Sequence, residues 1–336
     1  MTMAAFVALT SGLASLGLTG IVRAYAISRG ILDRPNARSS HTNPTPRGGG
    51  IALILASLAG VAAAVAAKLT EPRDALTVVI GIVVLGTIGA IDDMRSVGAV
   101  TRLVTHVGVA AWTLYMFNGL PFLYVGSITV PLGAAGYVLG VLGIVWSINL
   151  FNFMDGIDGL AGSQSALILG AGGLLLLWRG ETSFGTISLV VAASAAGFLV
   201  WNWPPAKIFM GDAGSGVIGF VVAAIAIGSE NRRSVPLLAF AIISGLFVAD
   251  ATITLVRRVA RGEHPADAHR EHAYQRLTRM WGSHRSVSAA SVAVTLLLAL
   301  IAAVATTIPS LLLPSLFAAL LLVGALLVTI ELYAPM

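Results

Sequence analysis

The sequence has no cysteine, and only 10% of its 336 residues are charged. The missing cysteines exclude disulfides and Cys-ligated metal sites. The scarcity of charge excludes an ordinary soluble domain, in which roughly 25% of the residues are charged. No polar stretch is long enough to form such a domain, since the longest covers about 256–285. Hydrophobic residues make up 57% of the chain, and its 37 glycines suit helices that pack closely in lipid.

Many of the apolar runs approach the ~20 residues that a helix needs to cross a bilayer. The sequence therefore predicts an all-α fold, a polytopic membrane bundle of about 11 transmembrane helices, with 10 as the alternative count. We expect residues 1–336 to form a single integral membrane domain without internal repeats. The first charge, Arg23, follows the first apolar run, which should remain as a helix. The expected spans lie near 3–22, 49–67, 75–91, 102–117, 133–151, 163–178, 184–201, 214–229, 235–255, 286–305 and 311–332.

The basic residues predict an orientation, because Lys and Arg collect in the cytoplasmic loops of membrane proteins. With the N-terminus outside, 15 of the 20 Lys and Arg residues fall in inner loops. The same orientation places most acidic residues and five of the six histidines on the inner side or at its boundary. We therefore expect catalytic cytoplasmic loops. The net charge of +5 follows from this distribution and does not indicate nucleic-acid binding.

Two adjacent carboxylates, Asp92 and Asp93, end the third predicted span. Such a pair at a membrane boundary is costly unless a divalent cation or a basic group offsets the charge. The alternative is a solvated loop in which Arg95 is the partner. At the start of the eighth span, F-M-G-D-A-G-S contains Asp212. Asp212 is either a metal ligand, beside a helix N-terminus that favours phosphate, or simply the N-cap of that helix.

A longer polar string, N-x-x-N-x-x-D-G-x-D-G, runs from Asn149 to Gly159. Its two Asp-Gly pairs, at Asp155 and Asp158, can place two carboxylates in one concave loop, where glycine lets a ligand approach the backbone. Oxygen ligands of this kind suit Mg²⁺, which also takes phosphate oxygens and water. One Asp-Gly pair alone would indicate only a turn.

The last inner loop carries His269, Arg270 and His272. On a helix the two histidines would share a face, and with Arg270 they could bind a diphosphate. The alternative is an amphipathic helix against anionic lipid, the only role expected for Arg276. Asp250, inside the ninth span, either pairs with a nearby Arg or lines the site. An early basic segment that contains His41 and Arg47 is either a phosphate site or an ordinary inner loop.

Together these motifs resemble the polyprenyl-phosphate N-acetylhexosamine-1-phosphate transferases, of the glycosyltransferase family 4 type. The strings D-R-P-x-x-R-S-S-H, P-R-G-G-G, D-D, N-x-x-N-x-x-D-G-x-D-G and F-M-G-D-x-G-S occur in the family's order between residue 33 and about residue 285. The last loop reads His-Arg-Glu-His where the peptidoglycan branch has consecutive histidines. It looks more like the O-antigen initiating branch, so a MurNAc-pentapeptide donor is the alternative.

The resemblance implies a bacterial inner-membrane enzyme that transfers a sugar-1-phosphate from a UDP-N-acetyl sugar to undecaprenyl phosphate, releasing UMP. This would be the first membrane step of cell-surface polysaccharide synthesis. The resemblance implies Mg²⁺, or Mn²⁺ in its place, and leaves a monomer and a homodimer both open. Carried over by motif, the catalytic residues are Asp92, Asp93 and His269, and the metal ligands are Asp212 and Asn152. The substrate-binding residues are Asn149, Asn152, Asp155, Asp158, Arg270, His272, Arg47 and His41.

Two other classes of membrane protein compete with this interpretation. A transporter would show inverted repeats, broken helices and acidic residues near the bilayer midplane. A CDP-alcohol phosphotransferase would carry Asp-Gly-x-x-Ala-Arg, but here Gly162 follows Asp158-Gly-Leu-Ala. For the transfer itself, direct attack by the lipid phosphate and a covalent aspartyl intermediate both fit, and we favour direct attack.

Overall fold

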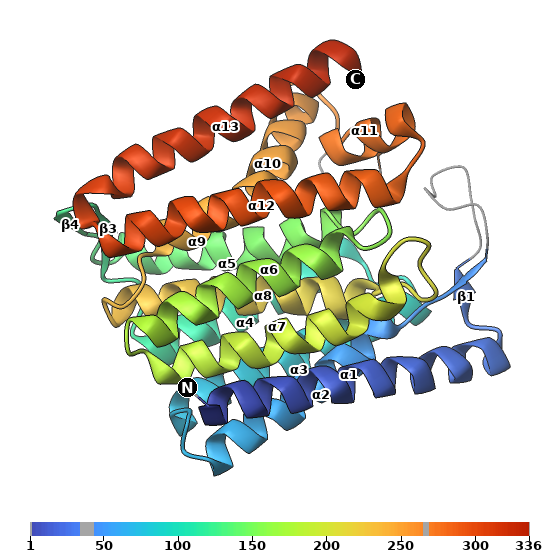
Figure 1. Ribbon diagram of the computed structural model, residues 1–336, viewed down its shortest axis with the longest axis horizontal. Coiled ribbons are helices and arrows are strands. Elements are labelled where there is room, and N and C mark those ends of the chain that lie inside the picture. The colour runs from blue at the N-terminus through green and yellow to red at the C-terminus, as the bar shows by residue number, and fades with distance from the viewer. Residues whose placement is uncertain (1, 34–43, 265–268, 336) are drawn as a thin grey trace.

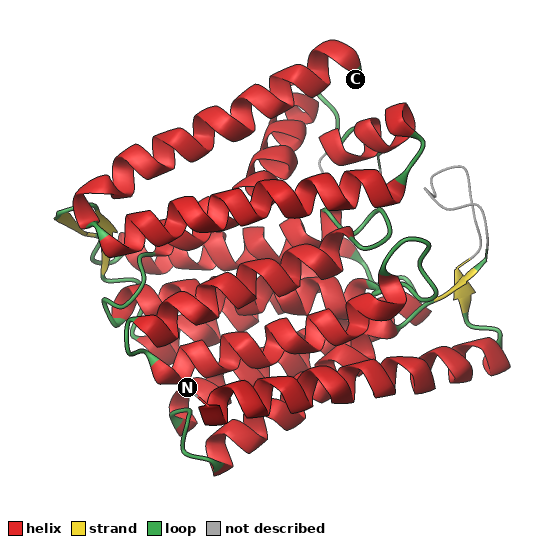
Figure 2. Ribbon diagram, in the orientation of Figure 1, coloured by secondary structure: helices red, strands yellow, loops and turns green. Residues whose placement is uncertain are grey.

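The protein is a bundle of helices that lie side by side, and almost all of the chain is helical (Figures 1 and 2). The computed structural model describes residues 2–33, 44–264 and 269–335. The long helices are α1 (Thr2–Arg29), α2 (Gly49–Ala66), α3 (Pro72–Met94), α4 (Ala99–Phe117), α5 (Ala135–Phe153), α6 (Leu160–Trp178), α7 (Thr182–Asn202), α8 (Asp212–Asn231), α10 (Gly245–Ala260), α12 (His284–Thr307) and α13 (Leu312–Tyr333). The shorter ones are α9 (Leu237–Ile243), α11 (Ala273–Trp281) and the 3₁₀ turn η1 (Pro309–Leu311).

The predicted polytopic bundle is confirmed. Within the described residues, nine helices are long and apolar enough to cross a membrane, or ten if α9 and α10 count as one bent span. The helix α4 stands where the fourth span was predicted, but it is not among these nine. The ninth predicted span is broken, since α9 and α10 meet at an angle of 79°. The break falls at the Ser244–Gly245 pair, and sharp helix kinks are common at Gly/Ser pairs.

The most deeply buried helix is α8, which packs between α3 and α5 and is buried along most of its length. Small residues let these helices approach closely. The Ser147 hydroxyl of α5 donates a hydrogen bond to the Gly219 carbonyl oxygen of α8 at 2.7 Å. Because α8 is packed against helices on several sides, its first residue, Asp212, is placed at one end of the bundle by that packing.

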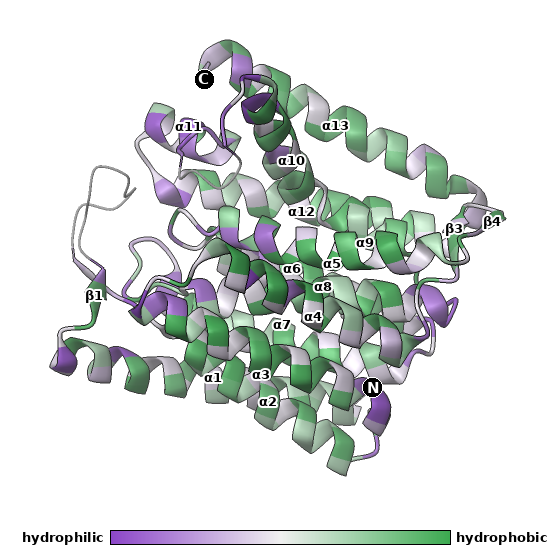
Figure 3. Ribbon diagram, turned by 180° about the vertical axis from the view of Figure 1, so that it is seen from behind, coloured by the Kyte–Doolittle hydropathy of each residue, from purple (hydrophilic) through white to green (hydrophobic). Residues whose placement is uncertain are grey.

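The two ends of the bundle differ. One end carries the hairpin of β3 (Phe122–Val125) and β4 (Ile128–Pro131). The opposite end, here called the site end, carries α11, the short pair β1 (Leu32–Asp33) and β2 (Thr45–Pro46), and several loops (Figure 1). Hydrophilic residues concentrate at the two ends, while the helices between them are largely hydrophobic (Figure 3). The acidic motifs from distant parts of the sequence meet at the site end.

Candidate active site

The centre of the site is the junction between the last turn of α3 and the first turn of α8. Asp93 accepts hydrogen bonds from the backbone N–H groups of Asp212, at 2.9 Å, and Ala213, at 3.3 Å. Asp93 therefore caps α8, and Asp212 does not act as the N-cap that the alternative interpretation assumed. Gly211 makes this contact possible, because its φ is +79° and a Cβ there would collide with the Asp93 carboxylate.

Arg47 is the basic group that faces this pair of carboxylates. Its guanidinium lies 3.0 Å from Asp93 Oδ1 and 3.8 Å from Asp212 Oδ1. The chain around Arg47 runs alongside Phe209, whose backbone N–H donates to the Pro46 carbonyl oxygen at 2.9 Å. The early basic segment and the F-M-G-D string are thus joined through their backbones. His41, by contrast, lies outside the described residues.

Asn152, at the end of α5, reaches the same point. Its Nδ2 donates to Asp212 Oδ1 at 2.9 Å and to Ser215 Oγ at 3.2 Å. The structure thus presents the amide NH₂ group, and not the amide oxygen, to Asp212. Asn152 orients the Asp212 carboxylate in this arrangement, and its predicted role as a metal ligand stays a prediction.

A polar cavity of about 240 Å³ opens beside Asp212. The pKa of Asp155 in its wall is raised to about 7, first by burial and then by the nearby charge of Asp212. The Asp158 carboxylate accepts from the Ala206 N–H at 3.0 Å and lies 3.2 Å from His284 Nδ1. Side chains that line the cavity are Asp33, Arg47, Asn152, Asp155, Asp158, Asn202, Phe209, Asp212, Gln275 and His284.

A second, smaller cavity of about 70 Å³ shares Asp212 and Asn152 with the first. Asp92 and Asn149 line this second cavity, so the structure separates Asp92 from the larger one. Asp92 accepts from Arg102 at 2.9 Å and from the Val97 N–H at 2.6 Å. The rest of the wall includes apolar residues of α3, such as Leu85 and Ile88.

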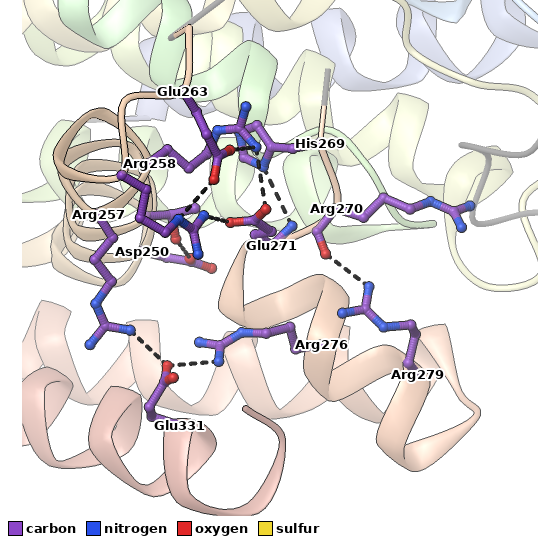
Figure 4. Close-up of polar contacts among 12 residues, drawn as sticks. Asp250, Arg257, Arg258, Glu263, His269, Arg270, Glu271, Arg276, Arg279 and Glu331 are labelled. Atoms are coloured by element: carbon purple, nitrogen blue, oxygen red, sulfur yellow. Dashed lines mark hydrogen bonds and ion pairs between the residues drawn. The ribbon is translucent and has the colours of Figure 1, made fainter. Parts of the chain in front are cut away.

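The last loop differs from the prediction. His269 and His272 do not share a helical face, because α11 begins only at Ala273. The His272 ring is buried and stacks on Phe153 and Tyr274 at centroid distances of 6.3 and 5.7 Å. Neither histidine lines the polar cavity. The Arg270 side chain extends away from the neighbouring ion pairs (Figure 4). The predicted roles of His269, Arg270 and His272 stay predictions.

His269 is an uncharged imidazole at neutral pH. Burial is the main cause that lowers its pKa to about 4, and the neighbouring His272 and Arg258 act in the same direction. Its Nδ1 accepts from the Glu271 N–H at 3.4 Å, which leaves the proton on Nε2. If His269 meets a diphosphate, it does so as a neutral hydrogen-bond donor and not as a cation.

One expectation about charged residues near this loop is wrong, and one of the two alternatives for Asp250 does not hold. Arg276 is not on a lipid-facing surface, because it is buried and its Nη1 donates to Glu331 at 2.7 Å and to the Ala334 carbonyl oxygen at 2.9 Å (Figure 4). Asp250 does not pair with a neighbouring Arg. It accepts from the backbone N–H groups at the start of α11.

Sequence reasoning missed several residues of the two cavities. Asn202, Gln275 and His284 line the polar cavity, and Arg102 and His106 line the smaller one. His284 had a detectable signal, since it is an inner histidine at the start of a span and the chain has only six. The other residues belong to no motif that we recognised.

The fold and the site define a multi-pass membrane protein with a polar cavity, the candidate active site, at one end. Residues 75–230 match the family model described as glycosyl transferase family 4. The chain is 33% identical, over 82% of its length and 78% of the relative, to a probable undecaprenyl-phosphate N-acetylglucosaminyl 1-phosphate transferase of Bacillus subtilis (strain 168). It is 32% identical, over 84% of its length and 77% of the relative, to a decaprenyl-phosphate N-acetylglucosaminephosphotransferase of Mycolicibacterium smegmatis.

A third relative, the undecaprenyl-phosphate alpha-N-acetylglucosaminyl 1-phosphate transferase of Escherichia coli (strain K12), is 30% identical over 84% of this chain and 77% of its own length. The chain therefore belongs to glycosyl transferase family 4, the polyprenyl-phosphate N-acetylhexosamine-1-phosphate transferases. It is an enzyme that transfers a sugar-1-phosphate, as the motifs predicted.

Proposed function

We propose that the enzyme transfers N-acetylglucosamine-1-phosphate from a UDP-sugar to undecaprenyl phosphate, giving a lipid-diphosphate-sugar and UMP. The observation that carries this proposal is the pair of cavities that share Asp212 and Asn152. The larger, polar cavity suits a nucleotide sugar, while the smaller one combines Arg102 with apolar residues of a membrane-spanning helix and suits the head of a lipid phosphate. Two substrates bound in these two cavities would meet at Asp212.

The donor set at the junction fits Mg²⁺. Within the described ranges, no three Asp, Glu or His side chains converge as a complete metal site. Mg²⁺, however, commonly takes one or two carboxylates and completes its shell with water and substrate phosphates. Asp93 and Asp212 already share one cationic partner, Arg47. Asp212 would hold the ion, and the ion when bound would offset phosphate charge as a Lewis acid.

Arg47 and Asp93 have different roles in the proposed reaction. Arg47 faces both the polar cavity and the carboxylates, so its guanidinium can form hydrogen bonds to the diphosphate of the UDP-sugar. Asp93 already accepts two backbone hydrogen bonds and an ion pair, so we assign it the task of holding α8 and Arg47 in place. No strong base is needed, because the second pKa of a phosphate monoester is about 6. The lipid phosphate can therefore attack directly.

We further propose that the site end faces the cytoplasm of a bacterial inner membrane and that the product begins a cell-surface polysaccharide. The distribution of Lys and Arg supports this orientation. The test is to incubate the purified protein with undecaprenyl phosphate, Mg²⁺ and a panel of UDP-N-acetyl sugars. Release of UMP with UDP-N-acetylglucosamine is the expected result. Release of UDP would contradict the proposal, because it would mean that the sugar is transferred without its phosphate.

A further inference from the structure

A buried carboxylate inside a membrane helix fixes the start of α11. Asp250 of α10 is only 3% exposed. Its Oδ1 accepts from the Ala273 N–H at 2.8 Å, and its Oδ2 accepts from the Tyr274 N–H at 3.1 Å. The two N–H groups belong to the first turn of α11, where unpaired N–H groups and the helix dipole favour a negative charge. Asp250 therefore acts as an N-cap supplied from another helix.

The capped end of α11 contacts the loop between α5 and α6, which contains Asp155 and Asp158 and is here called the donor loop because it lines the proposed site for the sugar donor. The Tyr274 hydroxyl donates to the Phe153 carbonyl oxygen at 3.0 Å, immediately before the loop that contains Asp155 and Asp158. Gly156 in that loop has no side chain, and a Cβ there would collide with the Tyr274 hydroxyl. The next residue, Gln275, lines the polar cavity. A shift of the first turn of α11 would thus move both Gln275 and the support of the donor loop.

The other anchor of α11 lies away from the cavity. Arg276 is bound to Glu331 and to the Ala334 carbonyl oxygen of the C-terminal segment, and Glu331 also pairs with Arg257 (Figure 4). None of these residues lines the polar cavity. Among the described residues, α11 is thus bound to α10 and to α13, and the Asp250 anchor is the one at the end that contacts the donor loop.

We propose that Asp250 is a positioning residue for donor binding, which holds α11 so that Gln275 lines the nucleotide-sugar cavity and Tyr274 supports the donor loop. The proposal rests on the proposed function, because it takes a UDP-sugar as the occupant of that cavity. Asp250 itself touches neither substrate. It acts through the backbone of α11.

The test measures kcat, the KM for UDP-N-acetylglucosamine, the KM for undecaprenyl phosphate and the melting temperature of four variants. These are Asp250→Asn, Asp250→Ala, Tyr274→Phe and the double variant Asp250→Asn/Tyr274→Phe. Asp250→Ala should raise the donor KM about tenfold or more, the order expected when hydrogen bonds to a charged group are lost. The acceptor KM should stay within about twofold, since the smaller cavity does not touch α11.

Asp250→Asn should rescue part of this loss, because its amide oxygen can still accept one hydrogen bond. Tyr274→Phe should raise the donor KM in the same direction. The double variant should lose less than the product of the two single effects, because both act through the same turn of α11. The matched control is Glu331→Gln, which weakens the distant anchor. It should lower the melting temperature without changing the donor KM.

Three outcomes would overturn the inference while wild-type enzyme releases UMP: a donor KM unchanged in all Asp250 variants, equal rises in both KM values, or multiplicative effects in the double variant. A wild-type enzyme that releases no UMP with any UDP-sugar would instead overturn the proposed function. The two failures are therefore distinguishable in one assay.

Discussion

The Asp212→Asn variant tests the centre of the site. The substitution keeps the size of the side chain. Asn152 Nδ2 donates to Asp212 Oδ1 at 2.9 Å in the wild-type protein, and the amide oxygen of Asn can still accept this hydrogen bond. The cap on α8 stays, because it is supplied by Asp93. The change that remains is the loss of one negative charge, 3.8 Å from Arg47, at the point where the two cavities meet. We therefore expect a protein that still folds but has lost its cation-binding group.

The expected fall in kcat is about a hundred- to a thousandfold, the order measured when one oriented electrostatic group is removed from an active site. The assay is UMP release as a function of Mg²⁺ concentration. A matched control is Asp74→Asn, because Asp74 is a carboxylate with an Arg partner too, but it lies in α3 at the opposite end of the bundle, 2.6 Å from Arg232. This control should reduce thermal stability and leave kcat nearly unchanged. Near-normal turnover of Asp212→Asn at saturating Mg²⁺ would refute the assignment.

Three further predictions test other parts of the site. Gly211→Ala should impair both activity and stability, because its Cβ would displace the Asp93 carboxylate from the N-terminus of α8; a fully active and equally stable variant, by kcat and melting temperature, would contradict that contact. His269→Ala should lower kcat by roughly ten- to a thousandfold, whereas His269→Gln should retain more activity because His269 is neutral at pH 7, with a pKa of about 4, and an amide also donates. The same low pKa predicts that kcat does not fall through loss of a His269 proton between pH 5 and 8, and equal losses in the Ala and Gln variants would rule out the donor role. Reporter fusions near residues 95, 157, 208 and 270 should all report cytoplasm, and a single periplasmic result would separate motifs that the site requires together.

The spans were predictable because their signal is local. An apolar run of sufficient length must be helical in lipid, since every backbone group has to be satisfied within the segment. The predicted run at 184–201, for example, corresponds to α7 at Thr182–Asn202. The bend between α9 and α10 was not predicted, although a Ser-Gly pair was visible in the sequence. A Ser-Gly pair permits a kink, but the packing of neighbouring helices decides whether the helix bends there.

The candidate site was predictable where a short motif contains several charged residues whose position at a membrane boundary requires a ligand or a cation. Asp93, Asp155, Asp158 and Asp212 were found because several carboxylates at one membrane boundary need a cation or a ligand to explain them. His284 was missed because its partner is remote in the sequence. The Asp158 N–H donates to His284 Nδ1 at 3.3 Å, across 126 positions of the chain. Only the packing of α12 against the donor loop brings these two residues together.

The wrong prediction for the last loop has the same origin. Sequence rules place the N-cap of a helix immediately before its first turn, and there they find His272, which makes no side-chain capping bond. The cap that starts α11 is Asp250, 23 positions earlier than Ala273 and in another helix. Because that cap satisfies the N–H groups of Ala273 and Tyr274, the helix begins at Ala273 and both histidines precede it. The acid that was hardest to explain inside a membrane helix is thus the residue that determines where the loop ends and the cavity wall begins.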